Sequence, residues 1–556
     1  MQLRSRPNQA PAPFPLRIVA PGEAPSGAAD LARNTYVISL MGAIAIGVVI
    51  RFALVLSSDF PLNDGGLFFG MARDIQASGY ALPEFASYNH RNIPFGYPPL
   101  SLYLAALVDD ATPMSLVQVF RFLPLLASCG TIPAFFLLAR SMLGSRRAVV
   151  IATALFALLP PGFMWMIMGG GLTRASGFLF ALLALHQVHE MHARRQLWRS
   201  LPAGIFSALT LMSHLEMAWL VAFSSLLFAI AYARDSYGIR SSLLVGAVGG
   251  ALSAPWWATV IAYHGPGPLL AAAHSGSYPL AGVFALVEYG PTIEPLFAMV
   301  AGLALLGGFA CVANRRYLLP VWVLAGAALD GRAFATSATI PVALLAAIGV
   351  QDVLLPLITH HRLIQPSLSP SAGAGDRAPS GAPSWLAGAV LSIVIAYAIL
   401  EALVASPKLL TGLKAPERDA MAWVAASTPA DSRFLIVTES RWPVDRTAEW
   451  FPALTGRQAI LTVQGTEWLP DDAFNREIAE YRGLQTCGQR LVDCVDEWVA
   501  DTGKTYDYMY FPKIDARVDK PEDGPCCISL RGSVARDDRF TQVFDGPGAV
   551  IYRFAN

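Results

Sequence analysis

The chain has 556 residues, of which 54% are hydrophobic and 14% are charged, and its formal net charge is +0. A soluble protein of this length would carry about 25% charged residues, and a neutral chain gives no indication of a nucleic-acid partner. The charge is also uneven, since no lysine precedes Lys408 and more than half of the Asp and Glu residues follow residue 405. The composition predicts a mainly α-helical, polytopic membrane protein with a soluble C-terminal domain.

The chain begins with a polar segment. Residues 1–34 are rich in Pro and Ala and contain several Arg. They lack the apolar core and the cleavage site of a signal peptide, so we expect the apolar stretch that follows to stay as a membrane anchor. We predict that residues 1–34 form a disordered cytoplasmic tail.

Apolar stretches recur from residue 35 to residue 405. A stretch of about 20 apolar residues crosses a bilayer as a helix, and the pattern predicts about eleven such spans, several of them short or interrupted by proline. The predicted spans are residues 35–56, 115–139, 147–168, 172–190, 200–213, 216–233, 241–263, 295–312, 317–330, 335–358 and 385–405.

The arginine residues between these spans predict their direction. If the spans alternate, four arginine-bearing connections fall on the same side as the arginine-bearing tail. They contain Arg140, Arg146 and Arg147; Arg194, Arg195 and Arg199; Arg234 and Arg240; and Arg315 and Arg316. Because positive residues accumulate in cytoplasmic connections, the N-terminus is predicted to be cytoplasmic in a plasma (inner) membrane. An odd number of spans then puts the C-terminal domain outside.

The first outer loop, residues 57–97, is long and aromatic. Leu67, Phe68, Met71 and Ile75 recur at helical spacing, which predicts a short helix at residues 65–78 that lies along the membrane interface. The stretch GYPPLSLYLAALV begins with a rigid turn at Gly96 and is too short to span, so we expect it to dip into the membrane and return.

The last span is set apart from the others by residues 361–384, which are rich in Pro, Ser, Gly and Ala. This composition is typical of a flexible linker, predicted here on the cytoplasmic side. Residues 385–405 would then anchor the extracytoplasmic domain formed by residues 406–556.

Ionisable side chains collect at the outer ends of the predicted spans. Such groups are costly at membrane depth and usually face a polar cavity, so we expect one site beneath the outer loops. Asp64 is the candidate general base, because Gly65 and Gly66 would let a ligand approach the backbone closely. The alternative is an N-cap, in which Asp64 only accepts hydrogen bonds from the amides that follow it. Asp59 is a reserve candidate that otherwise reads as a solvated loop residue.

Two arginines face the same outer side against the positive-inside bias, Arg174 in GGGLTRASG and Arg332 in LDGRAFATS. Their guanidinium groups would suit a phosphate or diphosphate, whereas the alternative for Arg174 is an interfacial anchor. His214 and Glu216 in MSHLEMAW are predicted to hydrogen-bond the substrate, the alternative being a buried pair that closes a tight turn. A histidine and a carboxylate alone are weak evidence for a metal site.

Two further carboxylates, Glu288 and Glu294, flank a Gly-Pro turn, where solvated side chains are the simpler interpretation. We keep both as reserve candidates for the site. No cofactor is firmly implied, no residue is predicted as a metal ligand, and a divalent metal is an unsupported alternative.

The order of these motifs resembles the GT-C superfamily of glycosyltransferases, which use lipid-linked sugars. The resemblance covers roughly residues 35–360, and the chain looks most like the branch of the protein mannosyltransferases and aminoarabinose transferases. It rests on an outer-loop Asp before a helix, then GYPPLSLYLAALV, GGGLTR, SHLE and a late arginine. The WWDYG motif of the oligosaccharyltransferase branch is absent from the sequence.

In the superfamily the acidic residue of the first outer loop lies in the active site, and the resemblance assigns this place to Asp64. Many relatives have Asp-Glu there, whereas this chain has Gly65 in the second position. SHLE is similar to a His-Pro-Glu segment of the family, with Leu215 in place of Pro, and so implies that His214 and Glu216 line the site.

The resemblance implies an inverting transfer of a sugar from a polyprenyl-phosphate donor to an acceptor hydroxyl, and the residues fit this chemistry. Asp64 would take the acceptor proton, and Arg332 with Arg174 would stabilise the leaving phosphate. Tyr97 would wall the lipid groove, unless it belongs to the aromatic belt of the membrane interface. The acceptor is a glycan, a lipid or a protein. The alternatives are a lipid or small-molecule transporter, and a degenerate scaffold that binds the lipid-linked sugar without turnover.

Residues 406–556 alternate helix-like and strand-like stretches, which predicts a small α/β domain. Helices are expected at ERDAMAWVAAS and DDAFNREIAEYR, and strands at RFLIVTE, AILTVQG, YDYMYF and AVIYRF. Its aromatic residues are expected to pack in the core or to stack on sugar rings, namely Trp442, Trp450, Phe451 and Trp468. Its four cysteines, Cys487, Cys494, Cys526 and Cys527, allow three disulfide pairings, and the sequence does not choose among them.

Overall fold

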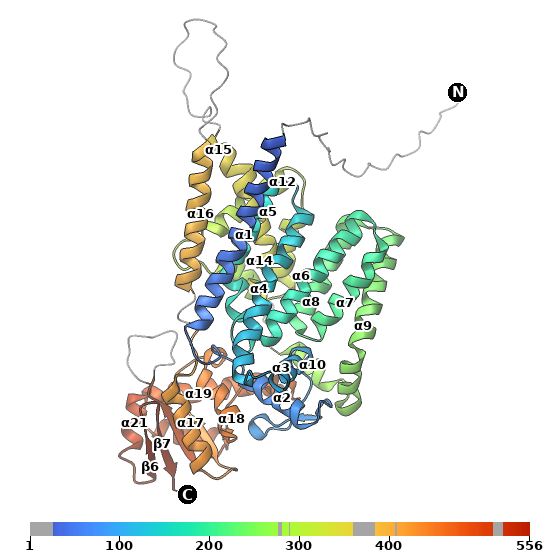
Figure 1. Ribbon diagram of the computed structural model, residues 1–556. Helices are drawn as coiled ribbons and strands as arrows, with labels where there is room; N and C mark the ends of the chain where they lie inside the picture. Colours follow the sequence, from blue (N-terminus) through green and yellow to red (C-terminus); the bar gives the residue numbers. More distant parts are fainter. Residues whose placement is uncertain are drawn as a thin grey trace, which may run out of the picture.

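The computed structural model describes residues 26–275, 281–288, 290–359, 384–405, 409–514 and 526–555. Most of the predicted tail and nearly all of the predicted linker therefore lie outside the described residues. The chain forms a block of long helices with a smaller mixed domain at one end (Figure 1). The N-terminal end of α1 (Ser26–Leu56) lies at the opposite end of the block.

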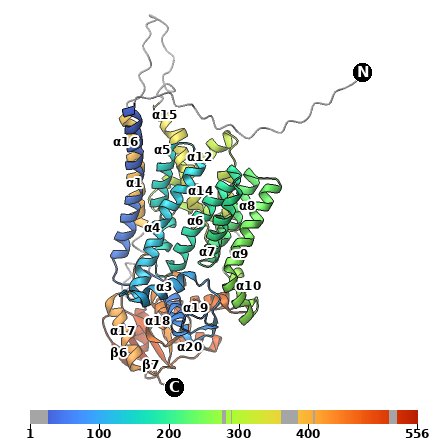
Figure 2. The same cartoon turned by 45° about the vertical axis from the view of Figure 1, so that its right-hand side comes forward.

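All eleven predicted spans coincide with helices. These helices are α1, α4 (Leu116–Met142), α5 (Arg146–Leu158), α6 (Gly171–Arg194), α7 (Ser200–Leu211), α8 (Leu215–Tyr232), α9 (Ser236–His264), α12 (Met299–Ala313), α13 (Leu318–Leu329), α14 (Phe334–Ile348) and α16 (Ser384–Ala405). Beyond α14 the chain continues through a π-helical turn (Gly349–Leu354) into α15 (Leu355–Thr359). Figures 1 and 2 show α16 beside α1 at one edge of the block.

Six helices among the described residues are long and apolar enough to cross a membrane, and a bent pair, Arg146–Leu158 with Pro160–Met166, makes up to seven. Helices α12 and α13 are apolar but short, α7 has only 12 residues, and α6 carries several ionisable side chains. The membrane-spanning character is therefore clear, while the count of about eleven spans stays a prediction.

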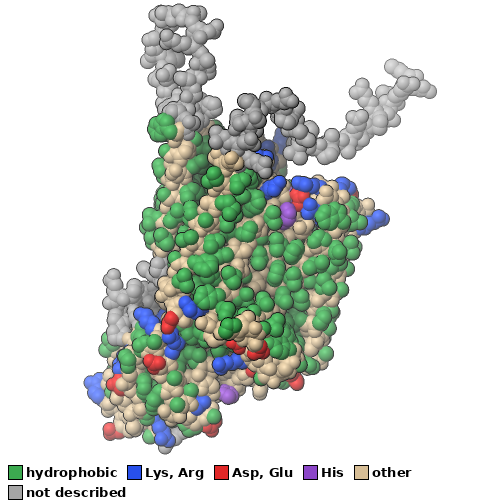
Figure 3. Space-filling view, in the orientation of Figure 1, with side chains coloured by type: hydrophobic (Ala, Val, Ile, Leu, Met, Phe, Trp, Pro, Cys, Tyr) green, Lys and Arg blue, Asp and Glu red, His purple; other side chains and the backbone are tan. Residues whose placement is uncertain are grey.

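The surface of the helical block agrees with a lipid environment. Hydrophobic side chains cover its flank, and Lys and Arg side chains gather at the end away from the C-terminal domain (Figure 3). Large apolar side chains such as Ile38, Leu243 and Phe309 are about 70% exposed on its helices. Exposed apolar area of this extent is typical of a membrane-embedded surface.

Loop 57–97 and the segment after it form two short helices at the domain end of the block, α2 (Gly66–Ala77) and α3 (Leu100–Ala111). The predicted helix exists, but its apolar face does not point to the membrane. Leu67, Met71 and Ile75 are buried within the protein. Helix α2 packs against α3 and against α18 (Arg446–Thr455) of the C-terminal domain. The expected interfacial helix is thus a packing element, because a distant part of the chain covers its apolar face.

The C-terminal domain contains a five-stranded mixed sheet in the order β4-β3-β5-β7-β6. Strand β3 is parallel to β4 and β5, whereas β5, β7 and β6 are antiparallel. The strands are β3 (Arg433–Ile436), β4 (Gln458–Ala459), β5 (Tyr508–Pro512), β6 (Phe540–Asp545) and β7 (Ala549–Phe554). The helices are α17 (Ala415–Ser427), α18, α19 (Ala473–Thr486), α20 (Asp493–Thr502) and α21 (Ile528–Val534). The predicted α/β class of this domain agrees with these elements.

Two details of this domain differ from the sequence prediction or were left open by it. The stretch AILTVQG is not a strand beyond Gln458–Ala459, since the chain then turns away into a short helix at Thr466–Trp468. The disulfides join Cys487 to Cys494 and Cys526 to Cys527.

The C-terminal domain is docked on loop 57–97 by specific polar contacts. The side-chain amide of Asn89 donates to the carbonyl of Ala459, and the amide of Ala459 donates back to Asn89 Oδ1, both at 2.8 Å. The Trp450 indole donates to the carbonyl of Asn63 at 2.9 Å. Loop 57–97 and the domain therefore form one packed layer over the end of the helical block.

Candidate active site

A cavity of about 1940 Å³ lies between the helical block and the C-terminal domain. Pockets for a single small ligand measure roughly 300–1,000 Å³, so this cavity has room for more than one ligand group. Its walls come from the segment before α2, from the ends of α6, α8 and α13, and from the C-terminal domain. The six side chains predicted to form the site all line it, namely Asp64, Tyr97, Arg174, His214, Glu216 and Arg332.

Asp64 points away from the helix that follows it. The N-cap residue of α2 is Gly65, which has no side chain to cap the helix. Instead, Asp64 Oδ1 accepts a hydrogen bond from the Gly170 amide at 2.9 Å, and Oδ2 lies 3.8 Å from Arg174 Nη1. The N-cap alternative for Asp64 is therefore not what the structure shows. Burial raises the pKa of the Asp64 carboxyl, and the Arg174 guanidinium opposes the rise.

The glycines near Asp64 allow close packing between different segments of the chain, rather than contact with a ligand. A Cβ at Gly66 would lie 2.3 Å from the carbonyl oxygen of Glu449 on α18, and one at Gly170 would lie 2.5 Å from Asp64 Oδ2. The expected close approach to Gly66 therefore exists, but α18 makes it. Gly65 itself has φ +127°, a conformation that favours glycine.

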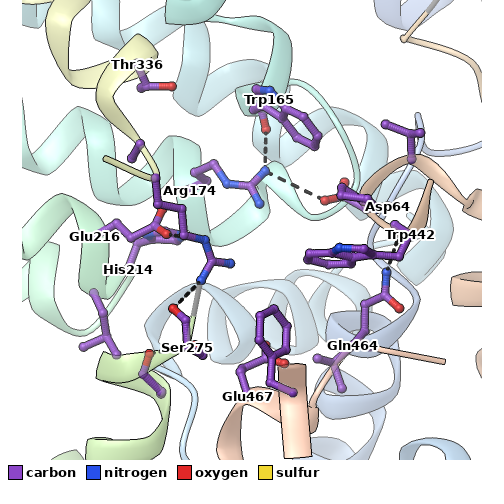
Figure 4. Close-up of a pocket in the computed structure, with 18 of the residues that line it drawn as sticks. Asp64, Trp165, Arg174, His214, Glu216, Ser275, Thr336, Trp442, Gln464 and Glu467 are labelled. Atoms are coloured by element: carbon purple, nitrogen blue, oxygen red, sulfur yellow. Dashed lines mark hydrogen bonds and ion pairs between the residues drawn. The ribbon is translucent and has the colours of Figure 1, made fainter. Parts of the chain in front are cut away.

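Arg174 lies in the first turn of α6 and is held on both sides (Figure 4). Its Nη1 donates to the carbonyl of Trp165 at 3.1 Å, and its guanidinium lies 5.4 Å from the centre of the Trp165 ring. The side chain faces the cavity and Asp64, so it is not a simple interfacial anchor. These contacts fix a positive charge beside the carboxylate.

A second arginine, Arg332, lines the same cavity. Arg332 Nε lies 2.9 Å from Glu216 Oε1, and its Nη1 donates to the carbonyl of Ser275 at 3.4 Å. The Arg332 side chain remains 46% exposed, which leaves room for an anionic ligand to reach the guanidinium. His214 directly precedes α8, is buried, and lies edge-on to Tyr97 with ring centres 6.3 Å apart.

The ring of Tyr97 packs between α2 and the C-terminal domain. It packs edge-on to Phe68 of α2 at 4.5 Å and to Trp468 of the C-terminal domain at 5.7 Å between ring centres. Its hydroxyl lies 3.4 Å from Thr173 Oγ1. Trp442 and Trp468 also line the cavity, while the other two aromatic residues singled out from the sequence, Trp450 and Phe451, are fully buried core.

The three reserve candidates lie elsewhere. Asp59 is an exposed ion-pair partner of Arg418 at 2.6 Å, and this pairing lowers the pKa of its carboxyl. Glu288 is exposed just after α11 (Ala281–Val287). Glu294 accepts hydrogen bonds from two amides in the first turn of α12, at 2.8 and 3.1 Å. None of the three lines the cavity.

A further carboxyl group, that of Glu449 on α18, interacts with Asp64 and was not predicted from the sequence. Glu449 lines the cavity, is 5% exposed, and its Oε1 accepts a hydrogen bond from the Gly65 amide at 2.8 Å. Gln464 Nε2 donates to its Oε2 at 3.1 Å. Burial raises the pKa of Glu449 to about 8, and the charge of Asp64 adds to the rise. No local pattern in TAEWF indicates this contact, since it depends on how the domain docks.

Within the described parts of the chain, one group of at least three potential metal ligands is close enough to share an ion: Glu439, Cys526 and Cys527. Both sulfur atoms of this group are joined to each other as a disulfide. Glu439 also lines the cavity, but the group does not include Asp64 or any other residue that the sequence predicted for the site.

No family model matches the chain, and no curated protein matches it in sequence. Solved structures do resemble its fold. The oligosaccharyltransferase AglB from Archaeoglobus fulgidus, with an inhibitory peptide and a dolichol-phosphate, has a TM-score of 0.56 and 14% identity and covers 86% of this chain and 69% of its own. The arabinofuranosyltransferase AftD from Mycobacteria has a TM-score of 0.57 and 16% identity, over 93% of this chain and 40% of its own. ArnT from Cupriavidus metallidurans, bound to undecaprenyl phosphate, has a TM-score of 0.53 and 14% identity, and the match covers 95% of this chain and 98% of ArnT.

These three proteins are glycosyltransferases of the GT-C type. The similarity extends over most of this chain, including the helical block and the C-terminal domain, although the sequence identity is low. The chain therefore has the GT-C fold of a multi-pass membrane protein, as the order of its sequence motifs predicted.

Proposed function

We propose that this chain, which has the GT-C fold, transfers a sugar from a polyprenyl-phosphate donor to an acceptor hydroxyl, with inversion at the anomeric carbon. The observation that carries the proposal is the cavity in which Asp64 faces Arg174 and which Arg332 also lines. A carboxylate and two separate cations are what a transfer needs when a proton is removed and a phosphate leaves.

In this mechanism the Asp64 carboxylate takes the proton of the acceptor hydroxyl while the hydroxyl oxygen attacks the anomeric carbon. The bond between that carbon and the phosphate oxygen breaks, and the phosphate leaves with the electron pair. Arg332 and Arg174 stabilise its charge, which has a large effect because the cavity is partly shielded from water. The sugar is a hexose or a pentose, and the acceptor is a glycan, a lipid or a protein.

The proposed setting is the outer face of the plasma (inner) membrane, with a cytoplasmic N-terminus and an extracytoplasmic C-terminal domain. The arginine-rich connections support this direction, since positive residues favour the cytoplasmic side. Hydrophobic side chains cover the flank of the helices (Figure 3), which suits a donor whose polyprenyl chain lies in the bilayer.

Photolabelling tests donor binding. A photoreactive polyprenyl phosphate in nanodiscs is expected to label peptides that line the cavity, such as those with Tyr97 and Trp165. Excess polyprenyl phosphate should remove this labelling, whereas the polyprenyl alcohol should compete at least about tenfold more weakly, since it lacks the charge that the arginines bind. Labelling restricted to the outer flank, or equal competition by the alcohol, would contradict the proposal.

A further inference from the structure

The C-terminal domain holds Glu449 in a fixed position at the active site. Asp445 is the N-cap of α18, and its Oδ1 accepts a hydrogen bond from the Ala448 amide at 3.0 Å. Asp445 Oδ2 in turn accepts from the hydroxyls of Thr438 and Tyr481, both at 2.6 Å. This network anchors the first turn of the helix to the body of the domain.

The other side of Glu449 is fixed by loop 57–97. The Tyr88 hydroxyl donates to the carbonyl of Glu449 at 2.6 Å, and the carboxylate accepts from the Gly65 amide and from Gln464. Gly65 directly follows Asp64, so one bond ties the Glu449 carboxylate to the residue next to the proposed base. An acidic side chain at position 65 has no room, because its Cβ would lie 2.8 Å from the carbonyl carbon of Gly169.

We propose that Glu449 is the second carboxyl group of the active site and that it works as a neutral acid beside the ionised Asp64. This inference rests on the proposed function. Two buried carboxylates close to one guanidinium resist double ionisation, so the pair retains one proton. Both carboxyl groups accept hydrogen bonds from N–H donors, Asp64 from Gly170 and Glu449 from Gly65 and Gln464. The ion pair with Arg174, at 3.8 Å, is formed by Asp64. A full positive charge at this distance favours the ionised form of Asp64, so Glu449 keeps the proton.

The neutral state matters for the donor. During transfer the acceptor proton goes to Asp64, and the phosphate takes the electron pair of the bond that breaks, while Glu449 keeps its own proton throughout. An ionised Glu449 would add a negative charge beside Asp64 and repel the phosphate. The charged or titratable groups that face Glu449 are Asp64 and Tyr88 from loop 57–97 and Arg174 from α6.

The pKa of Glu449, raised to about 8 by burial and by Asp64, sets the direction of the effect. Below this value the site holds one negative charge, and above it two. We expect the wild-type kcat/KM to fall about tenfold per pH unit above pH 8, mainly through a higher KM for the donor, because one pH unit changes the neutral fraction tenfold. The glutamine side chain of Glu449→Gln cannot ionise, so the kcat/KM of this variant should be nearly the same below and above pH 8.

Glu449→Ala separates this role from simple packing. Alanine removes the hydrogen bond to Gly65, so its neutral-pH activity should be at least about tenfold below that of Glu449→Gln, which retains a polar group there. The proposal is overturned if Glu449→Gln keeps the alkaline fall of the wild type, or if Gln and Ala are equally impaired at neutral pH.

A second readout does not need turnover. Protonated carboxyl groups give an infrared band, and the difference spectrum between wild type and Glu449→Gln isolates the band of Glu449. The other buried acids, Asp445 and Glu467, are present in both proteins and cancel. This band should disappear as the pH rises through about 8, and at a lower pH in Asp64→Asn, which lacks the neighbouring charge. Absence of the band at pH 7 would overturn the neutral-acid role. If no donor is turned over but the band titrates as expected, the proposed function fails and the assignment of the proton stands.

Discussion

Replacing Asp64 by asparagine is expected to lower kcat for sugar transfer by at least about 100-fold, the usual contribution of a positioned general base. Asparagine has nearly the same shape but does not accept the acceptor proton. Donor binding should persist, since the arginine side chains are unchanged. Turnover and donor binding, followed in parallel in nanodiscs, check this result.

The matched control is Asp59→Asn, in the same loop. Asp59 is exposed, pairs with Arg418 and lies outside the cavity. Its replacement should leave kcat within about twofold, because exposed ion pairs contribute little. If Asp64→Asn turns over the donor as well as the wild type does, Asp64 is not the base, and Glu216 or Glu449 takes its place as the candidate.

Replacing Arg174 by glutamine is expected to lower kcat/KM by about 100- to 1,000-fold, with a higher KM for the donor. Two effects combine. The leaving phosphate loses a cation, and Asp64 loses the charge that opposes the rise of its pKa. Because the base must be ionised, the acidic limb of the pH profile should move to higher pH. Steady-state kinetics across pH measure both effects.

Arg195, which follows the other end of α6, is the control for Arg174. It forms an exposed ion pair with Asp235 at 2.5 Å, and neither residue lines the cavity. Arg195→Gln should change kcat/KM by less than about twofold. Equal losses in the two variants would mean that Arg174 supports the helix and not the reaction.

The membrane part of the site could be predicted because it depends on local patterns. Span ends that alternate between two sides bring Asp64, Arg174, Glu216 and Arg332 to the same side, whichever way the helices pack. Ionisable groups at such ends must then find polar surroundings. Hydropathy and arginine distribution therefore predicted that these side chains share one side, and the structure places them in one cavity.

The contribution of the C-terminal domain could not be predicted, because it depends on docking between distant segments. The apolar residues of α2 read as a membrane-facing stripe, but α18 covers them. The sequence predicted that a ligand would approach Gly66 closely, but the backbone of Glu449 occupies the space beside this glycine. The stretch after Ala459 was predicted to be a strand. In the structure the chain leaves the sheet after Ala459, whose carbonyl accepts a hydrogen bond from Asn89.

Hydropathy alone does not fix the number of membrane spans. Hydropathy finds α7, α12 and α13, yet each is shorter than a bilayer-crossing helix usually is. Helix α6 is long enough, but its polar residues serve the cavity at one end and ion pairs at the other, as with Glu190 and Arg194. Composition alone does not decide how such helices sit in a bilayer.

Turnover of labelled polyprenyl-phosphate sugars by the wild-type chain in nanodiscs tests the central claim most directly. With a panel of hexosyl and pentosyl donors and an envelope extract as the source of acceptor, we expect polyprenyl phosphate to be released and the sugar to appear on the acceptor with inverted configuration. If donors bind but none is cleaved, the chain is a scaffold for lipid-linked sugars. If an intact donor crosses the bilayer instead, the chain is a transporter, and the proposed sugar transfer is wrong.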